Sequence, residues 1–446
     1  MWKPQKFHLL NSWTSQSAIR QLTIASSGRS TDCLVRRADQ FFQKRNLPAA
    51  FEFYRQALAG HPASIEAWSG LGAVSLLYGD FEHAAHCYHK VLALDPKDVA
   101  ASCNLGNALF FNGKFEKGIE CFQRAVALDA DNADAHLGLA FAYLASGNFE
   151  QGWRQYEWRL KKKPFLASGC DAPRWQGEAL NGRRILLCAE QGLGDTLQFV
   201  RYAPLVAERG GHVVLQVQPQ LHRLLGAMEG ITEIVSQSQS SLDIHCQCPF
   251  LSLPLLFETR LETVPSHVPY IKPHWDDINT WSERMKGSGL KVGLVWAGHP
   301  GHVRDLQRSI PLRTFEPLLR VPGISFFSLQ WGEAAAQIKD LSAEFAVQDI
   351  EGHCTDFGDT AAALTALDLV ISVDTSVAHL AGALRKPVWI LLPYVPDWRW
   401  LLKGDTCPWY PTARLFRQPA PGDWPAVIAD VATQLKILAA GPAVSA

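Results

Sequence analysis

The first half of the chain repeats with a fixed period of 34 residues, and this period constrains the fold more than any other feature. Pro62, Pro96 and Pro164 lie one and then two periods apart, and Ala130 occupies the position between them. The recurring positions are Leu71, Leu105 and Leu139; Gly79, Gly113 and Gly147; and Tyr54, Tyr88, Phe122 and Tyr156. Such self-similarity indicates one small structural unit that is stacked several times.

Each period has the composition of a helical hairpin. The glycine permits a tight turn, the aromatic residue fills the gap between helices, and the proline ends the second helix. The segments AWSGLGAVSLLYGDFEHAAHCYHKVLALDP and NLGNALFFNGKFEKGIECFQRAVALDA resemble tetratricopeptide repeats at nearly every position. We therefore expect four units over residues 31–164, stacked into a curved solenoid. Arg37 and Ala38 replace the usual Leu-Gly pair of the first unit, as in a terminal, capping repeat.

The resemblance to tetratricopeptide repeats implies a concave surface for peptides or proteins. The O-linked N-acetylglucosamine transferases, which also join such repeats to a sugar-transfer domain, grip the acceptor with an asparagine ladder. The corresponding positions here are Arg36, Gly70, Asn104 and Gly138, so this ladder is missing. The repeats are expected either to recruit a protein acceptor or partner, or to serve as a scaffold that stabilises a homo-oligomer.

The overall composition excludes some classes of function. The 42 basic and 43 acidic residues nearly balance, so nucleic acid is not an expected partner. No apolar run approaches the roughly 20 residues of a membrane-spanning helix. Residues 1–30 lack the pattern of a secretory signal and are expected to form a loosely ordered leader or an imperfect first helix. The ten cysteines are scattered through a large chain, which predicts free thiols and a cytoplasmic protein.

No metal site is predicted. The tightest group of soft ligands is His245-Cys246-Gln247-Cys248, and no second pair of ligands stands at zinc-like spacing nearby.

After a linker at residues 165–182, short apolar runs alternate with helical segments. This pattern is typical of α/β structure with parallel strands. We expect one Rossmann-like lobe over residues 183–275, a second over 290–417, and a C-terminal helix and tail over 418–446. The predicted fold class is thus an N-terminal α-solenoid followed by two α/β lobes.

A glycine loop follows the first predicted strand of this half. Gly192 and Gly194 fit the start of a dinucleotide fingerprint, but Leu197 stands where the third glycine should be, which disfavours a dehydrogenase. Asp195 then lies at the carboxyl end of a strand and the start of a helix, where open parallel sheets bind ligands. Its carboxylate is suited to accept a proton from an attacking hydroxyl, or simply to cap the helix.

A second loop of this kind occurs near the end of the chain. Asp374, Thr375 and Ser376 precede a helix whose free backbone N–H groups would suit a diphosphate. His379 on the first turn is placed to reach a phosphate or a sugar hydroxyl, and Arg308 is the side chain best suited to neutralise the pyrophosphate. The alternative is a capped helix with a histidine in the core.

Together, QGLGDTLQFVRYAPLVAERG and ISVDTSVAHLAGALRKPVWILLP resemble the lipopolysaccharide heptosyltransferases of glycosyltransferase family 9. This resemblance, over about residues 183–417, implies a GT-B fold and a nucleotide-sugar donor as co-substrate. It implies that Asp195 is the catalytic base. It further implies a donor site at Gly192, Gly194, Asp374, Thr375, Ser376 and His379, with Arg308 in place of the family's phosphate-binding lysine.

The chain departs from the lipid-acting enzymes in its shorter first lobe and in its repeats. It is more similar to the repeat-fused branch that includes protein and flagellin glycosyltransferases, which favours a protein acceptor. We expect inverting, metal-independent transfer, without a cofactor. Trp398 and Trp400 are expected either to stack on sugar or base, or to close the core, and Arg399 between them is expected to pair with a phosphate or an acceptor group. The alternatives are a non-catalytic binding module with a vestigial nucleotide pocket, and a transferase that elongates a glycolipid.

Overall fold

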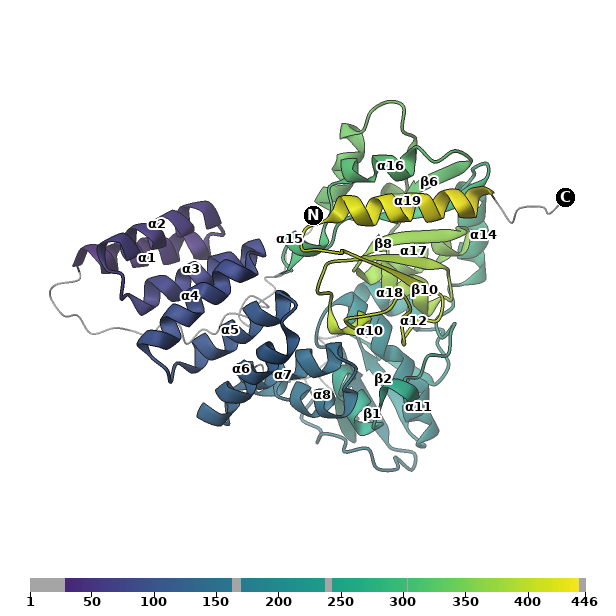
Figure 1. Cartoon of the computed structure of the whole chain (residues 1–446). Helices are drawn as coiled ribbons and strands as arrows, with labels where there is room; N and C mark the ends of the chain where they lie inside the picture. The colour runs from purple at the N-terminus through teal and green to yellow at the C-terminus, as the bar shows by residue number, and fades with distance from the viewer. Residues whose placement is uncertain (1–28, 163–169, 237–242, 303, 441–446) are drawn as a thin grey trace. The chain divides into compact units, whose positions relative to one another are not determined.

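A computed structural model describes residues 29–162, 170–236, 243–302 and 304–440 (Figure 1). Most of the expected leader and part of the expected linker therefore lie outside the described residues. The chain divides into two compact units. The repeat unit comprises the chain up to Ser146, Arg154–Lys163 and His299–Gln307, and the α/β unit comprises Gly147–Trp153, Pro164–Gly298 and Arg308–Ala446.

Paired antiparallel helices follow one another through the repeats. The first helices of successive hairpins begin one period apart, after the capping residues Ser64, Asp98 and Asn132, whose side chains accept backbone N–H groups. The helices are α1 (Arg29–Gln43), α2 (Leu47–Gly60), α3 (Ile65–Tyr78), α4 (Phe81–Leu94), α5 (Val99–Phe111), α6 (Phe115–Leu128), α7 (Ala133–Ala145), α8 (Phe149–Tyr156) and α9 (Arg159–Lys162).

The turn inside each hairpin uses a left-handed residue. Gly79, Gly113 and Gly147 have φ of 79°, 77° and 82°, as their recurrence predicts. In the first hairpin the same register is occupied by Arg45, with φ of 56°. The period therefore sets the turn conformation even where glycine is replaced.

The α/β unit contains two parallel sheets. The first has four strands in the order β3-β2-β1-β4, and it is flanked by short helices. Its elements are β1 (Arg184–Cys188), α10 (Leu193–Phe199), α11 (Ala203–Glu208), β2 (His212–Gln216), α12 (His222–Leu225), β3 (Ile231–Val235), β4 (Cys246–Pro249) and α13 (Leu253–Leu256). Because β1 is central and all pairings are parallel, the loop after β1 opens at the carboxyl edge of the sheet.

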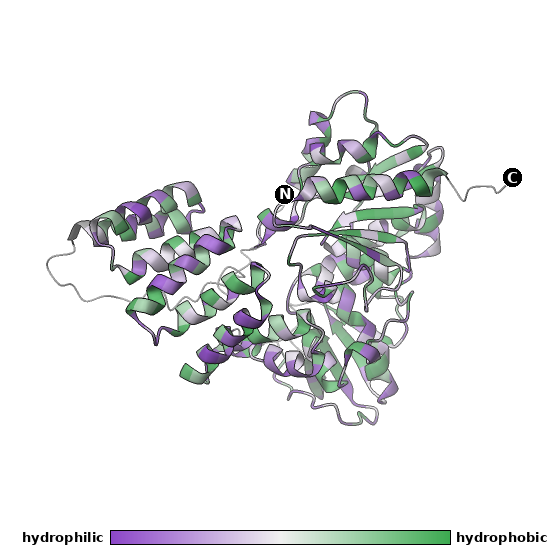
Figure 2. Cartoon of the chain, in the orientation of Figure 1, coloured by the Kyte–Doolittle hydropathy of each residue, from purple (hydrophilic) through white to green (hydrophobic). Residues whose placement is uncertain are grey.

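The second sheet has six strands in the order β10-β9-β8-β5-β6-β7, again all parallel. Strands β5, β8 and β9 in the middle of this sheet are nearly continuous apolar runs, as expected for strands covered on both faces (Figure 2). Its elements are α14 (Trp275–Arg284), β5 (Leu290–Val295), α15 (Asp305–Arg308), α16 (Glu316–Leu319), β6 (Ile324–Ser328), β7 (Val347–Asp349), α17 (Phe357–Thr365), β8 (Leu369–Val373), α18 (Ser376–Ala383), β9 (Val388–Leu392), β10 (Ala413–Arg417) and α19 (Trp424–Ala440).

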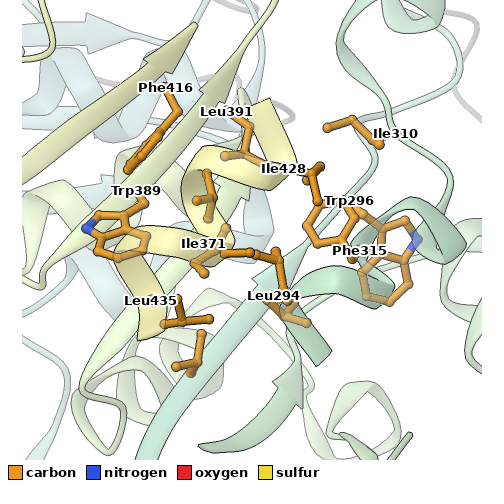
Figure 3. Packing of buried hydrophobic residues seen from close by; sticks show 14 of the residues in the cluster. Leu294, Trp296, Ile310, Phe315, Ile371, Trp389, Leu391, Phe416, Ile428 and Leu435 are labelled. Carbon is orange, nitrogen blue, oxygen red and sulfur yellow. The ribbon is translucent and has the colours of Figure 1, made fainter. Parts of the chain in front are cut away.

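The core of the second sheet joins strand residues to α19. Leu294 and Ile371 from β5 and β8 lie in one buried cluster with Ile428 and Leu435 of α19 (Figure 3). Together with the helical repeats, the two parallel sheets confirm the predicted fold class, an α-solenoid followed by an α/β region. Among the described helices, none combines the length and hydropathy that a membrane crossing requires.

One segment of the last hairpin belongs to the α/β unit. Within Gly147–Trp153, the indole of Trp153 is 2 % exposed, and its Nε1–H donates to the carbonyl of Thr259 at 3.0 Å. Its ring also lies edge-on to those of Phe199 and Trp398. The part of α8 up to Trp153 therefore belongs to the α/β unit, although it lies in the register of the last repeat.

Candidate functional site

The helices that follow β1 and β8 pack directly against each other. Gly194, in the first turn of α10, faces the first turn of α18, and a Cβ atom there would lie 2.9 Å from Cδ2 of His379 and 3.5 Å from Cα of Ser376. The absence of a side chain at this glycine permits the close approach. Two loops distant in the sequence, each at the carboxyl end of a strand, thereby place Asp195 and Asp374 in one cluster.

Both carboxylate oxygens of Asp195 are engaged. Oδ2 accepts the backbone N–H of Gly192 at 2.8 Å, which caps α10, and Oδ1 forms an ion pair with the guanidinium of Arg399. Burial raises the pKa of Asp195, while the positive charge of Arg399 and the bond from Gly192 lower it. The side chain is 19 % exposed. Asp195 thus caps its helix, which is one of the two roles expected from the sequence. Its carboxylate also belongs to a charged cluster.

The start of α18 contributes the second part of the cluster. Thr375 occupies the N-cap position with extended backbone, but its side chain accepts no N–H from the helix and instead lies 3.0 Å from the hydroxyl of Ser372. Asp374 precedes it, and burial followed by the negative charge of Asp397 raises the pKa of Asp374. Ser376 begins the helix. The first N–H groups of α18 therefore receive no side-chain cap from Thr375.

His379 is a core residue in this structure. Its ring is 5 % exposed, its Nδ1 lies 2.9 Å from the hydroxyl of Tyr410, and it stacks on the indole of Trp400 at 5.0 Å between centroids. Burial, assisted by the nearby positive charge of Arg399, lowers the pKa of His379 to about 3. The neutral imidazole, rather than a cation, is the form that neighbours Asp374, whose Oδ1 is 4.0 Å from Nε2.

Three arginines and three aspartates lie around His379 and the first turns of α10 and α18. Arg308 donates from Nη1 to the backbone carbonyl of Asp374 at 2.9 Å, so the residue predicted to bind the pyrophosphate lies beside α18. Arg399 bonds Asp397 through Nη1 at 2.7 Å. Arg201 is 4 % exposed and donates to carbonyl and hydroxyl oxygens. We call Asp195, Asp374, Asp397, Arg201, Arg308 and Arg399 the acid–arginine cluster.

The two tryptophans proposed for ligand stacking are buried instead. Trp398 is 2 % exposed and Trp400 is fully buried, so neither presents a ring face to a ligand in this conformation. Trp398 packs edge-on against Trp153, while Trp400 lies against His379. In the structure these rings contribute to the core, which is the second of the two roles expected for them, and ligand stacking stays a prediction.

Sequence reasoning missed two members of the cluster. Arg201 stands in the otherwise apolar part of the segment after β1, and an arginine in such surroundings was an available signal. Asp397 caps the short 3₁₀ helix Trp398–Trp400, accepting the N–H of Arg399 at 3.1 Å. An aspartate ahead of a compact aromatic turn is a capping signal that could have been recognised.

Other candidate sites lie apart from this cluster. One cavity of about 320 Å³ lies in the repeats, lined in part by His89, Lys117 and Cys121. Another of about 250 Å³ lies against β7, lined in part by Trp281 and His353. Within the described ranges, no group of three or more histidine, cysteine or acidic side chains is arranged to hold a metal ion. All ten cysteines are free thiols.

The chain contains tetratricopeptide repeats followed by a two-sheet parallel α/β unit. Residues 65–98 match the tetratricopeptide repeat family, and residues 106–147 match a second family described as TPR repeat.

Comparison with individual proteins gives partial matches. Protein FlbA of Caulobacter vibrioides (strain ATCC 19089 / CIP 103742 / CB 15) is 28 % identical over 323 residues, which cover 65 % of this chain and 52 % of FlbA. The chain thus spans about half the length of this curated relative.

Solved structures match a smaller share of the chain. A MamA crystal structure is 27 % identical over 31 % of this chain and 75 % of its own, with a TM-score of 0.28. A thermophilic tetratricopeptide protein of Thermus thermophilus is 18 % identical over 30 % and 75 % of the two chains, with a TM-score of 0.29.

Proposed function

We propose that the α/β unit is a GT-B glycosyltransferase that moves a sugar from a nucleotide-sugar to an acceptor hydroxyl. The observation that carries this proposal is the meeting of Asp195 with the start of α18 in one acid–arginine cluster at the carboxyl ends of β1 and β8. This is where open parallel sheets bind ligands. The resemblance of both loops to family 9 glycosyltransferases supports the same assignment.

In the proposed reaction, Asp195 accepts the proton of the acceptor hydroxyl as that oxygen bonds to the anomeric carbon. The bond from this carbon to the diphosphate oxygen breaks on the opposite face, which inverts the configuration. The N–H groups at Thr375 and Ser376 and the guanidinium of Arg308 stabilise the departing nucleoside diphosphate. These groups supply the positive charge that the leaving group requires without assigning a metal ion to the step.

We propose a protein acceptor, recruited by the repeats, because tetratricopeptide repeats form surfaces for peptides and proteins. The ten free thiols fit a reducing compartment and support a reaction in the cytoplasm.

A non-catalytic nucleotide-binding module is the second candidate. It is favoured by one observation: both oxygens of Asp195 already have partners, Gly192 and Arg399. A carboxylate used only as a cap and an ion-pair partner would not serve as a base.

The test replaces Asp195 by Asn in the full chain and measures sugar transfer and donor hydrolysis with a panel of nucleotide-sugars. Asn retains an oxygen for the helix cap but cannot take up the hydroxyl proton, so we expect transfer to fall by about 10³-fold or more while nucleotide binding is retained.

Asp423→Asn is the matched control, since Asp423 also caps a helix, accepting the N–H of Ala426 at 3.2 Å, and transfer should be unchanged. Turnover retained in Asp195→Asn would remove Asp195 from the role of base. Nucleotide binding without turnover in the unaltered protein would favour the binding module. Intact masses of host proteins, with and without the gene, would identify the acceptor.

A further inference from the structure

Arg399 connects the two sheets at the acid–arginine cluster. Its Nη2 pairs with Asp195, its Nε donates to Oε1 of Gln198 at 2.8 Å, and its Nη1 donates to Asp397 at 2.7 Å. Asp195 and Gln198 belong to α10 beside the first sheet, whereas Arg399 follows β9 of the second. Arg399 is 7 % exposed. Arg399 is a planar cation with five N–H donors, and one of its two terminal nitrogens is held by the candidate base, Asp195.

The same guanidinium acts on the donor side of the cluster. Its charge lowers the pKa of Asp374 and contributes to the low pKa of His379, so it lies within electrostatic reach of the start of α18. Trp400, the next residue, is fully buried, and its indole N–H has no well-formed hydrogen bond, although it lies close enough to the carboxylate of Asp374 to lower the pKa of Asp374 by weak hydrogen bonding. A buried donor so weakly satisfied, beside the uncapped turn of α18, can turn to a ligand oxygen as its partner.

We propose that Arg399 is a positioning residue shared between Asp195 and the donor diphosphate, so that donor binding releases Asp195 to act as base. The inference rests on the proposed function and adds an order of events to it. Before the donor arrives, Arg399 occupies the oxygen that the acceptor hydroxyl needs. A diphosphate carries more negative charge than a carboxylate and accepts a bidentate fork, so it draws the guanidinium away. The donor therefore binds before the acceptor.

This sharing makes Asp195 a competitor of the diphosphate for one cation. Removing the charge of Asp195 must then strengthen diphosphate binding, and only while Arg399 is present. A purely structural ion pair predicts the reverse, because breaking it would loosen the site and weaken binding. The two roles are separated by a double-mutant cycle on binding, which does not depend on turnover.

The experiment titrates UDP, ADP, GDP, CDP and dTDP calorimetrically into the full chain and its Asp195→Asn, Arg399→Met and doubly substituted variants. Relative to the unaltered chain, we expect Asp195→Asn to bind whichever of these diphosphates the chain recognises about threefold to tenfold more tightly. Arg399→Met should bind it about tenfold more weakly, or weaker still. In the double variant the gain from Asn should vanish, leaving the affinity of Arg399→Met.

Arg414→Lys is the matched control, because Arg414 also bonds a glutamine of the same unit, Gln434, at 2.9 Å, and diphosphate affinity should not change. Circular dichroism and thermal unfolding establish that each variant is folded. If Arg399→Met is not, Arg399→Lys takes its place. Lysine keeps the positive charge but cannot form two parallel hydrogen bonds. Arg399→Lys should therefore weaken diphosphate binding and reduce the increase in affinity that Asp195→Asn gives.

The outcomes separate this inference from the function on which it rests. If the unaltered chain binds no diphosphate in the panel, the proposed function and this inference both fail. If it binds one, but Asp195→Asn gives no gain or the gain persists in Arg399→Met, only the shared arginine is wrong. In transfer assays, Arg399→Met should also move the acid limb of the kcat/KM profile for the donor to higher pH, because Arg399 lowers the pKa of Asp195 before the donor binds.

Discussion

At the scale of single residues, His379 shows how burial fixes a protonation state. Its pKa is lowered to about 3, first by burial and then by the charge of Arg399. An unfolded histidine has its pKa near 6.5, so between these values the unfolded chain binds a proton at this position and the folded chain does not. The contribution of His379 to stability is therefore fully present above pH 6.5 and is lost as the pH falls toward 3.

This difference predicts a pH-dependent effect of replacing His379 by Gln. Between pH 7.5 and 5.5, the unaltered protein should lose roughly 1 kcal/mol more of its free energy of unfolding than His379→Gln loses. Urea titrations of both proteins at the two pH values measure the difference, in which the other histidines cancel. Parallel losses in the two proteins would show that the imidazole titrates normally in the folded state.

The charged residues of the site could be predicted singly from the sequence, but their pairing could not. Asp195 and Asp374 were recognisable because each follows a buried strand, a local pattern. The ion pair of Asp195 with Arg399 joins positions 204 residues apart, and no periodicity encodes such a contact. Likewise, the composition around Trp398 and Trp400 suited both a binding face and a core, and only tertiary packing decides between these.

At the scale of the elements, the repeats are held together by aromatic rings set against glycines. The ring of Phe122 in α6 lies between Gly106 of α5 and Gly138 of α7, where added Cβ atoms would lie 2.8 Å and 2.3 Å from it. Gly70 stands in the same relation to Tyr54, at 2.2 Å. Two of the positions compared with an asparagine ladder thus serve helix packing, which explains why they are glycines.

Replacing Gly138 by Ala introduces a methyl group that would displace the buried ring of Phe122, at a cost of about 1–3 kcal/mol. Alanine gains roughly 1 kcal/mol over glycine in a helix, so we expect a net destabilisation of the repeats of up to about 2 kcal/mol. Thermal unfolding followed by circular dichroism gives the effect.

Gly60→Ala provides the control. A Cβ atom at Gly60, the last residue of α2, would have a nearest neighbour at 3.9 Å, so stability should stay constant or rise. If both substitutions behaved alike, close packing at Gly138 would not be the cause.

The elements were largely predictable, since their signals are local. The period of 34 residues predicted the hairpins and their turn glycines, and the apolar runs near Leu186, Leu294 and Val370 predicted buried strands. The membership of segments in the compact units was not predictable. His299–Gln307 lies in the sequence of the α/β region but belongs to the repeat unit, and Gly147–Trp153 does the opposite. The unit to which each segment belongs depends on tertiary contacts, and no periodic sequence pattern encodes these contacts.

At the scale of the whole molecule, Trp153 ties a repeat-like segment into the α/β unit. Its replacement by Ala should destabilise that unit by about 3–5 kcal/mol, because a buried indole and its hydrogen bond to Thr259 are lost. Hydrogen exchange should report lost protection around Phe199 and Trp398.

Trp158→Ala is the control within the repeat unit, where the indole stacks on His136 at 3.7 Å. Its effect should be confined to the repeats. Lost protection in the repeats alone after Trp153→Ala would place Trp153 with them instead.

The order of strands in the second sheet also has a consequence for biosynthesis. β5 leaves the ribosome before β6, which pairs along one of its edges, and before β7, which pairs with β6. The strand on the other edge of β5, β8, is translated only after α17. Until then the nascent chain presents an open, apolar strand edge that can pair wrongly with another chain. We therefore expect slower translation of α17 to prolong this exposure and to lower the yield of folded protein.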